Sequence, residues 1–215
     1  MLYALNNQKE KISPSRGESA ICPCCEGKVI SKCGEIIAWH WAHARGSDCD
    51  DWYESDNKWS IDWKNRFNKD NCEIIIDGRR ADIKTDNDEI IRLQKRTLSP
   101  EEIRDIEEHF GNMVWVFKLD DAVHNIEFRD KGRFTTFRWK YPKKTIAYTS
   151  KPTILDLGDN KLFILKKMYK GTPCGGWGYF FDVEQFLKTN KFNTYKFSKV
   201  EDEKKNWKNR NTEDE

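Results

Sequence analysis

The sequence lacks any long apolar segment. No stretch approaches the roughly 18 consecutive apolar residues that a membrane-spanning helix needs. An apolar run with a basic flank and a small-residue cleavage site, as a secretory signal requires, is also missing from its start. These absences argue against the membrane-spanning and secreted classes. We therefore expect a cytoplasmic protein without a membrane partner.

The sequence also lacks an excess of charge of either sign. It has 38 Lys and Arg residues against 36 Asp and Glu residues, which leaves a net charge of +2. Any affinity for nucleic acid must therefore come from local basic patches and not from the global field. Aromatic residues, in contrast, make up 13% of the chain, a content typical of a folded protein. At 215 residues the chain can form one substantial domain and a small module.

The cysteines favour a metal site over a disulfide framework. Their number is odd, seven, and three of them crowd into CPCC. Cys22 and Cys25 form a C-x2-C pair, and HWAH supplies His40 and His43. Two thiolates and two imidazoles are typical of tetrahedral zinc, and four protein ligands make such a site structural. The alternative is core thiols with surface histidines. Cys24 is a candidate to replace one of these four ligands. Cys33 and Cys49 are weaker candidates.

Apolar spacing predicts a helix, strands, a second helix and a further strand, which is the order of a mixed α/β domain. The second helix has a clear start signal, with Ser99 as N-cap, Pro100 at the first position and Glu102 completing a capping box. Gly111 is its expected stop. The apolar stripe of the first helix has three members: Trp59, Trp63 and Phe67.

These patterns divide the chain into four parts. Residues 1–50 form a small β-rich module around the metal, and residues 51–122 form the mixed α/β core. Residues 123–195 are expected as a β-rich C-terminal extension, in which GTPCGGWGYF lacks a phosphate-loop lysine pattern and is interpreted as a turn that packs Trp177. The charged tail, residues 196–215, has little apolar content and is expected to be disordered.

The stretch RRADIKTDNDEIIRLQK, residues 79–95, predicts two antiparallel strands around a polar turn. With the turn centred on Asn87, Asp82 falls opposite Arg92. Alternation then gives one apolar face and one face dominated by polar groups, which is either a solvated side of the sheet or the floor of an active site. The apolar face holds Ala81, Ile83, Ile91 and Leu93. The other face holds Arg80, Asp82, Lys84, Ile90, Arg92 and Gln94.

A second candidate surface is RDKGRFTTFRWKYPKK, residues 129–144. It holds seven basic residues and one acidic residue, interleaved with aromatic rings. Cations beside rings that stack on bases favour nucleic-acid binding. The alternative is a solvated hairpin whose aromatic side packs into the core. The candidate nucleic-acid-binding residues are Arg133, Arg138, Lys140, Lys143 and Lys144.

Across residues 1 to about 190 the chain resembles the competence protein CoiA-like family, whose members resemble PD-(D/E)XK nucleases joined to an N-terminal zinc-binding module. The matching pieces are CPCC, HWAHA, WYES, WSIDWKNRF, RADIKT, LQK followed by LSPEEI, and GWG. The resemblance implies a mixed-sheet, restriction-endonuclease-like core between the zinc-binding β module and the β-rich extension, and it implies nucleic-acid processing with DNA as the partner.

The resemblance also implies site residues, position by position. Asp82 matches the metal-binding aspartate of the family, and Gln94 matches a glutamine that stands where many related nucleases carry a lysine. Arg92 stands where the family has a glutamate, and Ser60 stands where it usually has a histidine. The remaining matches are an acidic and a basic position before the strands, Glu54 and Lys64.

Arg92 leaves three interpretations open, because hydrolysis of this type needs Mg²⁺ or Mn²⁺ held by carboxylates and a guanidinium cannot ligate a cation. The first is a zinc-containing nucleic-acid-binding protein with a degenerate nuclease fold, in which Arg92 pairs with Asp82. The second is an active nuclease whose site is rebuilt from Asp82, the Leu93 carbonyl and Glu54, with Gln94 or Lys64 as positioning groups. The third is a protein-interaction module or inhibitor on a nuclease scaffold.

Overall fold

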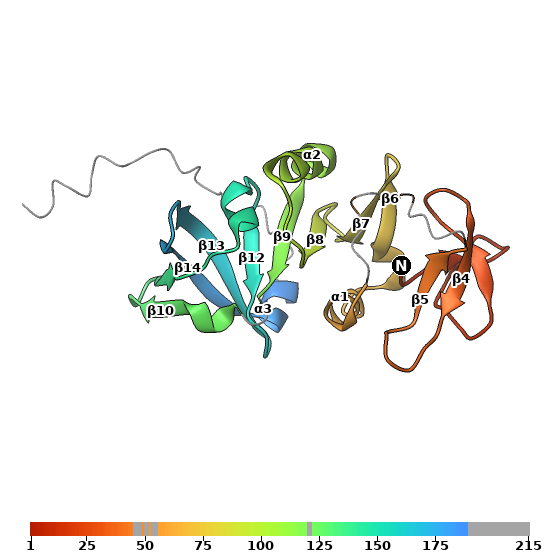
Figure 1. Ribbon diagram of the computed structural model, residues 1–215, viewed down its shortest axis with the longest axis horizontal. Coiled ribbons are helices and arrows are strands. Elements are labelled where there is room, and N and C mark those ends of the chain that lie inside the picture. Colours follow the sequence, from red (N-terminus) through yellow and green to blue (C-terminus); the bar gives the residue numbers. More distant parts are fainter. Residues whose placement is uncertain (45–48, 50–51, 53–55, 120–121, 189–215) are drawn as a thin grey trace, which may run out of the picture.

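The computed structural model describes residues 1–44, 49, 52, 56–119 and 122–188. Glu54 and the expected tail, residues 196–215, lie outside these ranges. The described chain forms an elongated body with a small sheet at one end and the C-terminal strands at the other (Figure 1). Within the described residues, no helix is long and apolar enough to cross a membrane.

The N-terminal module is a five-stranded sheet with strand order β2-β1-β3-β4-β5. A small core of apolar side chains, centred on Val29 and Trp41, holds it together. Residues 34–39 do not extend the sheet, and Ile36 in this loop is 98% exposed. The strands are β1 Ala4–Leu5, β2 Lys11–Ile12, β3 Ser19–Ile21, β4 Lys28–Lys32 and β5 His40–His43.

The remainder of the described chain forms a nine-stranded mixed sheet with strand order β10-β11-β14-β13-β12-β9-β8-β7-β6. Its strands are β6 Cys72–Ile76, β7 Arg79–Lys84, β8 Ile90–Gln94, β9 Met113–Lys118, β10 Ile126–Asp130, β11 Thr135–Trp139, β12 Thr153–Asp156, β13 Lys161–Tyr169 and β14 Cys174–Asp182. The helices are α1 Lys58–Lys64, α2 Pro100–Phe110 and α3 Val183–Lys188, and the short 3-10 segments are η1 Lys69–Asn71, η2 Val123–Asn125 and η3 Lys144–Tyr148.

The order α1, β6, β7, β8, α2, β9 confirms the predicted succession of helix, strands, helix and strand. β6, β7 and β8 pair antiparallel, whereas β8 and β9 pair parallel. β9 in turn pairs parallel with β12. The expected boundary near residue 122 therefore falls within one continuous sheet, which joins the core to the C-terminal strands.

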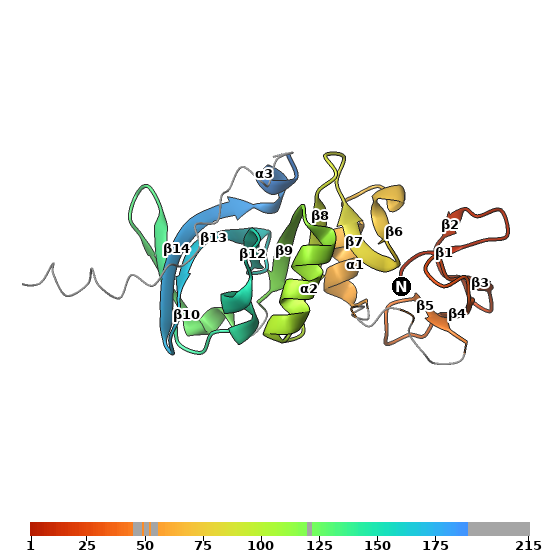
Figure 2. The ribbon, with the colours of Figure 1, turned by 90° about the horizontal axis from the view of Figure 1, so that it is seen from above.

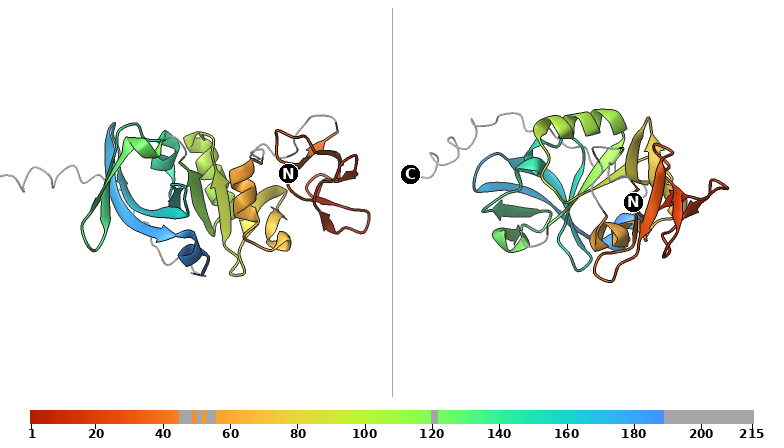
Figure 3. Two further views of the ribbon diagram at one scale, coloured as in Figure 1. Left: turned by 90° about the horizontal axis from the view of Figure 1, so that it is seen from below. Right: turned by 45° about the vertical axis from the view of Figure 1, so that its right-hand side comes forward.

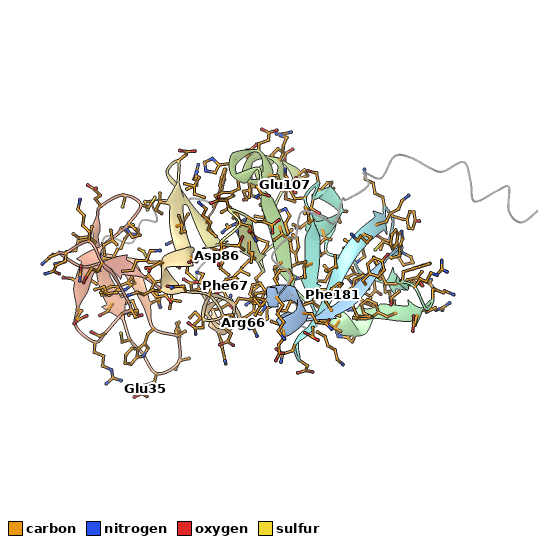
Figure 4. All side chains as sticks on the ribbon, turned by 180° about the vertical axis from the view of Figure 1, so that it is seen from behind. Glu35, Arg66, Phe67, Asp86, Glu107 and Phe181 are labelled. Atoms are coloured by element: carbon orange, nitrogen blue, oxygen red, sulfur yellow. The ribbon has the colours of Figure 1, made fainter. Side chains whose placement is uncertain are left out.

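The two faces of this sheet carry separate cores. α2 covers one face, and α1 and α3 cover the other (Figure 1). Ile106 and Phe110 of α2 pack with Trp115 on the first face, and Trp63 and Phe186 pack with Ile91 on the second. Phe181, labelled in Figure 4, is partly buried against the second core.

Both predicted helices form, and α2 begins and ends where its capping signals place it. At α2, Ser99 Oγ accepts a hydrogen bond from the N–H of Glu102 at 3.1 Å, and the Ser99 N–H donates to Glu102 Oε2 at 2.8 Å. Gly111 ends the helix at a φ of 60°. α1 is shorter than its apolar stripe and ends at Lys64, so that Phe67 lies beyond it. The indole N–H groups of Trp59 and Trp63 both donate to Asp156 Oδ2 at 2.7 Å, which anchors α1 to β12.

Glu107 fixes α2 on its face of the sheet (Figure 4). Its buried carboxylate accepts hydrogen bonds from the indole N–H of Trp115 at 2.8 Å and from the Ser150 N–H at 2.9 Å. The Ser150 hydroxyl also donates to it. Because a buried carboxylate costs free energy unless it is hydrogen-bonded, these contacts make Glu107 a structural residue.

The interpretation of GTPCGGWGYF as a turn is wrong, because Cys174–Asp182 forms the long strand β14. The glycines make this strand possible. A Cβ at Gly176 would lie 2.7 Å from ring atoms of Phe137, and one at Gly178 would lie 2.7 Å from ring atoms of Phe163. The two phenyl rings thus occupy the space that side chains on β14 would need.

Candidate functional site

A compact cluster of thiols and one imidazole lies in the N-terminal module. The donor atoms of Cys22, Cys25, His43 and Cys49 all lie within 4.8 Å of one another. The Cys22 and Cys49 sulfurs are 3.7 Å apart, and Cys25 Sγ is 3.3 Å from His43 Nε2. These four side chains come together although Cys49 is 27 residues from Cys22.

Local backbone structure brings the ligands together. The Cys22 N–H donates to the Gly27 carbonyl at 2.8 Å, and the Glu26 N–H donates to the Cys22 carbonyl at 3.0 Å. This tight turn places Cys25 beside Cys22, with Glu26 at a φ of 58°. The pairing of Val29 on β4 with His43 on β5 then carries the imidazole to the turn.

The cluster fits a zinc ion. Tetrahedral zinc with Zn–S bonds of about 2.3 Å implies sulfur–sulfur separations of about 3.8 Å, close to the 3.7 Å between Cys22 and Cys49. Three thiols and an imidazole are soft ligands that suit zinc. Four protein ligands leave no position for a reacting water, so a zinc bound here would be structural.

His40 does not take part in this cluster. The sequence analysis assigned the fourth ligand position to His40, but Cys49 occupies that position. The reason is the strand period of two, since His40 and His43 are three residues apart on β5 and point to opposite faces. The His40 ring lies instead with Nδ1 2.9 Å from the Ala38 carbonyl. Cys24 also lies outside the cluster and donates to the Gly78 carbonyl at 3.4 Å.

The thiols of the cluster differ in their affinity for protons. Burial raises the pKa of Cys22 and of Cys49. The pKa of Cys25 is lowered: its slight burial acts against this, but hydrogen bonds from the Gly27 N–H and from the Cys49 and Cys22 thiols stabilise its thiolate. Cys25 is therefore the thiol of this cluster most readily deprotonated for a metal.

The second candidate site lies between β7 and β8. The pairs Ile83 with Ile91 and Lys84 with Ile90 confirm the predicted register around Asn87. Arg92 Nη1 lies 2.7 Å from Asp82 Oδ2, and both side chains are largely buried.

The strands part beyond Ile83, where no further β7–β8 pair follows among the described residues. The N–H of Leu93 donates to Asp82 Oδ2 at 2.9 Å and so finds a side-chain partner. Leu93 packs with Ile83 and Ile91 as predicted, whereas Ala81, which lies where the strands have separated, packs with Ile90 in the opposite core.

The other predicted catalytic residues have structural partners. Gln94 is fully buried, and its Nε2 donates to the Arg96 carbonyl at 3.1 Å. Ser60 forms a capping box with Asn57 at the start of α1. Lys64 is buried between two carboxylates, with Nζ 2.5 Å from Asp56 Oδ1 and 2.7 Å from Glu73 Oε1.

Asp56 is a site residue that the sequence interpretation missed. Asp56 and Asp82 line the same small pocket, which has a volume of about 10 Å³. Its other lining residues are Asn57, Trp59, Ser60, Leu93 and Lys95. A volume of this size holds no more than about one water molecule. Its position directly before the N-cap Asn57 gave no signal of this, because Asp56 and Asp82 meet only in the folded chain.

The Lys64 cluster also ties the N-terminal module to the sheet. Glu73 accepts hydrogen bonds from the N–H groups of Leu2 and Tyr3, both at 2.9 Å. Glu73 has a φ of 52°, a backbone conformation that side chains rarely adopt. Lys11 of the module adds a contact at the same place, because its Nζ donates to the Cys72 carbonyl at 2.6 Å.

The predicted basic surface is partly used by the fold. Arg133, Arg138, Lys140 and Lys144 are exposed. The fifth residue, Lys143, donates to the Lys118 carbonyl at 2.8 Å. The aromatic residues divide in the same way: Phe137 and Trp139 are buried in the core, whereas Phe134 and Tyr141 are exposed.

A small β-sheet module built around a cluster of cysteine and histidine, joined to a mixed α/β sheet, is the class of protein that these features define. Residues 4–51 match the family described as competence protein CoiA, N-terminal domain. This match confirms the CoiA-like resemblance over the N-terminal module. The matched range includes all four members of the cluster. No curated protein matches the chain, and no solved structure does.

Replacing Cys49 with serine is expected to release zinc from the module, whereas His40→Ala is expected to leave the zinc content unchanged. A lost thiolate removes one of four ligands, and metal affinity contributes directly to the folding of such modules. Elemental analysis of the purified variants measures zinc per chain. Equal loss in both variants, or loss in His40→Ala alone, would contradict the assignment of Cys49.

Asp56→Asn is expected to reduce the decrease in the free energy of unfolding as the pH falls into the acid range. Burial acts to raise the pKa of Asp56, but the charge of Lys64 and its hydrogen bond outweigh this, so the pKa lies below its ordinary value of 3.8. A carboxyl with a depressed folded pKa stabilises the fold fully above its unfolded pKa, and that contribution is lost as the pH falls from there toward the folded pKa. Urea unfolding from about pH 5 to about pH 2 measures the slope. An identical slope in both proteins would show that Asp56 does not contribute to the pH dependence of the free energy of unfolding.

Proposed function

We propose that the chain is a nucleic-acid-binding protein with a restriction-endonuclease-like core that does not hydrolyse phosphodiesters. Two features support the proposal. The order of α1, β6, β7, β8, α2 and β9 agrees with the mixed-sheet core that the resemblance implies. The match of residues 4–51 to the family described as competence protein CoiA, N-terminal domain, supports a competence-related function.

The observation that carries the proposal is the occupation of Asp82. Its Oδ2 accepts hydrogen bonds from Arg92 at 2.7 Å and from the Leu93 N–H at 2.9 Å. A hydrolytic Mg²⁺ or Mn²⁺ needs carboxylate oxygens and a shell of waters. Arg92 stays protonated, so it repels a cation at the position where the family has a glutamate.

Among the described residues, the carboxylates near Asp82 are held by other contacts. The charge of Asp56 is balanced by Lys64, and Lys64 itself bridges to Glu73. Asp56 and Asp82 line a small pocket of about 10 Å³, which holds about one water molecule. The small size of the pocket supports the proposal, because a Mg²⁺ ion at such a site usually keeps several waters. In this proposal the centre of the core is structural, and zinc is the structural metal of the N-terminal module.

A second candidate function has one observation in its favour. The loop before β5 exposes Ile36, Ile37 and Trp39, with Ile36 98% accessible. Exposed apolar side chains that lie together are common at protein interfaces. This loop supports a protein-interaction module or inhibitor built on the same scaffold, which requires no affinity for nucleic acid.

The proposal predicts binding without cleavage. The unmodified protein and Asp82→Ala are incubated with supercoiled and single-stranded DNA in Mg²⁺ or Mn²⁺, and neither is expected to cut. Binding measured in parallel should weaken steeply as salt rises, because phosphate contacts release counterions. Cleavage by the unmodified protein that disappears in Asp82→Ala would establish a working metal site. An absence of binding at low salt would favour the interaction module.

A further inference from the structure

The outer side of the C-terminal strands carries side chains that the two cores do not use. β13 and β14 curve around one core (Figure 2). Side chains alternate between the two sides of a strand. Gly176 and Gly178 lie on the inner side of β14, against the rings of Phe137 and Phe163. Trp177, between them, therefore points outward.

Strand pairing gathers outward side chains from β11 and β13 around Trp177. Trp177 pairs with Thr136 on β11 and with Lys167 on β13. Two positions along β14, Gly175 pairs with Arg138 and with Tyr169. We name this surface the aromatic face; its main members are Phe134, Arg138, Lys167, Tyr169, Trp177 and Tyr179.

Three rings of the aromatic face are in contact with one another. The Trp177 ring centroid lies 5.6 Å from that of Phe134 and 5.9 Å from that of Tyr179, both in edge-on geometry. Phe134 is 38% exposed and Tyr169 is 43% exposed. None of these four rings belongs to the buried clusters of the described chain. Trp177 and Tyr179 are half-buried, so all four rings keep part of their surface in solvent.

Positive charge surrounds these rings. Arg138 is exposed beside Gly175, and Lys167 Nζ lies 5.3 Å from the ring centroid of Tyr169. On β10, Glu127 pairs in register with Arg138 and lies 3.8 Å from Arg129. Three cations against one carboxylate leave the surface positive, which complements a polyanion.

Gly175 leaves part of the aromatic face without a side chain. Gly175 lies within β14 and pairs with Arg138 on one side and with Tyr169 on the other. A Cβ at this position would meet one atom, the Phe137 carbonyl oxygen, at 3.3 Å. Glycine weakens a strand interior and often marks a place where a ligand approaches the backbone closely. Gly175 thus separates Arg138 from Tyr169 on the two neighbouring strands.

We propose that the aromatic face binds single-stranded nucleic acid, with bases stacked on the rings of Trp177 and Tyr169 and phosphates at Arg138 and Lys167. Stacking on aromatic side chains needs bases with a free face, which a duplex does not offer along its length. This inference rests on the proposed function and deepens it, because it names the strand state and the surface.

The test is fluorescence anisotropy of labelled oligo-dT, oligo-rU and a DNA duplex against the full chain. Trp177→Ala should weaken binding of the single strands by about tenfold or more, the size expected for one base–aromatic stack. Arg138→Gln should lower the slope of log K against log salt by about 0.7, the value for one phosphate contact on a single strand. The matched controls, Tyr148→Ala on η3 and Arg104→Gln on α2, change an exposed ring and an exposed cation elsewhere.

Three outcomes overturn the inference. If the unmodified protein binds single strands and both test variants bind like their controls, nucleic-acid binding stands but the aromatic face is not its site. If the duplex binds more tightly and Trp177→Ala has no effect, the strand state is wrong. If no oligonucleotide binds at low salt, the proposed function fails together with the inference. Arg138→Gln changes an exposed residue, so it keeps the test decisive if Trp177→Ala unfolds. The ratio of oligo-dT to oligo-rU affinity separates DNA from RNA as the occupant.

Discussion

The ion pair between Asp82 and Arg92 is the interaction on which the centre of the sheet depends. It lies where β7 and β8 part, and it supplies the Leu93 N–H with an acceptor that the neighbouring strand does not provide. Arg92 also donates to the carbonyl of Trp52, so the pair reaches from the sheet to the segment that follows the N-terminal module. Removing one partner of a buried pair typically costs about 3–5 kcal/mol, because the other charge is left uncompensated. In the function that we propose, a carboxylate held in this way contributes to the fold and does not serve as a metal ligand.

The other buried carboxylates near this centre follow the same logic. Asp56 and Glu73 share Lys64, and Glu73 uses its remaining capacity on the backbone of the N-terminal module. These charges thus join two parts of the chain. The surface that we propose for recognition lies away from the centre. The N-terminal module and the C-terminal strands occupy opposite ends of the molecule (Figure 3). The aromatic face belongs to the C-terminal strands.

Local rules predicted what local interactions decide. The turn around Asn87 fixed the register that sets Asp82 against Arg92, and the capping box at Ser99 marked the start of α2. The predictions failed where contacts between residues distant in sequence determine the structure. His40 was assigned to the metal by spacing alone, although the strand period turns it away, and Cys49 reaches the cluster only through the folded chain. The glycines around Trp177 suggested a turn, because the rings that fill their space come from β11 and β13. The family resemblance implied a metal-binding role for Asp82, which stays a prediction. It did not indicate Asp56 as a neighbour of Asp82, because the two residues line the same small pocket only in the folded chain.

The measurement that tests the central claim most directly is Mn²⁺ binding followed by electron paramagnetic resonance in the absence of nucleic acid. The unmodified protein and Asp82→Ala should take up Mn²⁺ equally weakly, since Asp82 is held by Arg92 and by the Leu93 N–H. Arg92→Glu restores a second carboxylate beside Asp82, and it is the variant expected to gain a site, because paired carboxylates are ligands that such ions prefer. A bound Mn²⁺ in the unmodified protein that is lost in Asp82→Ala would contradict the account, because it would show that the carboxylate leaves its guanidinium partner for a metal.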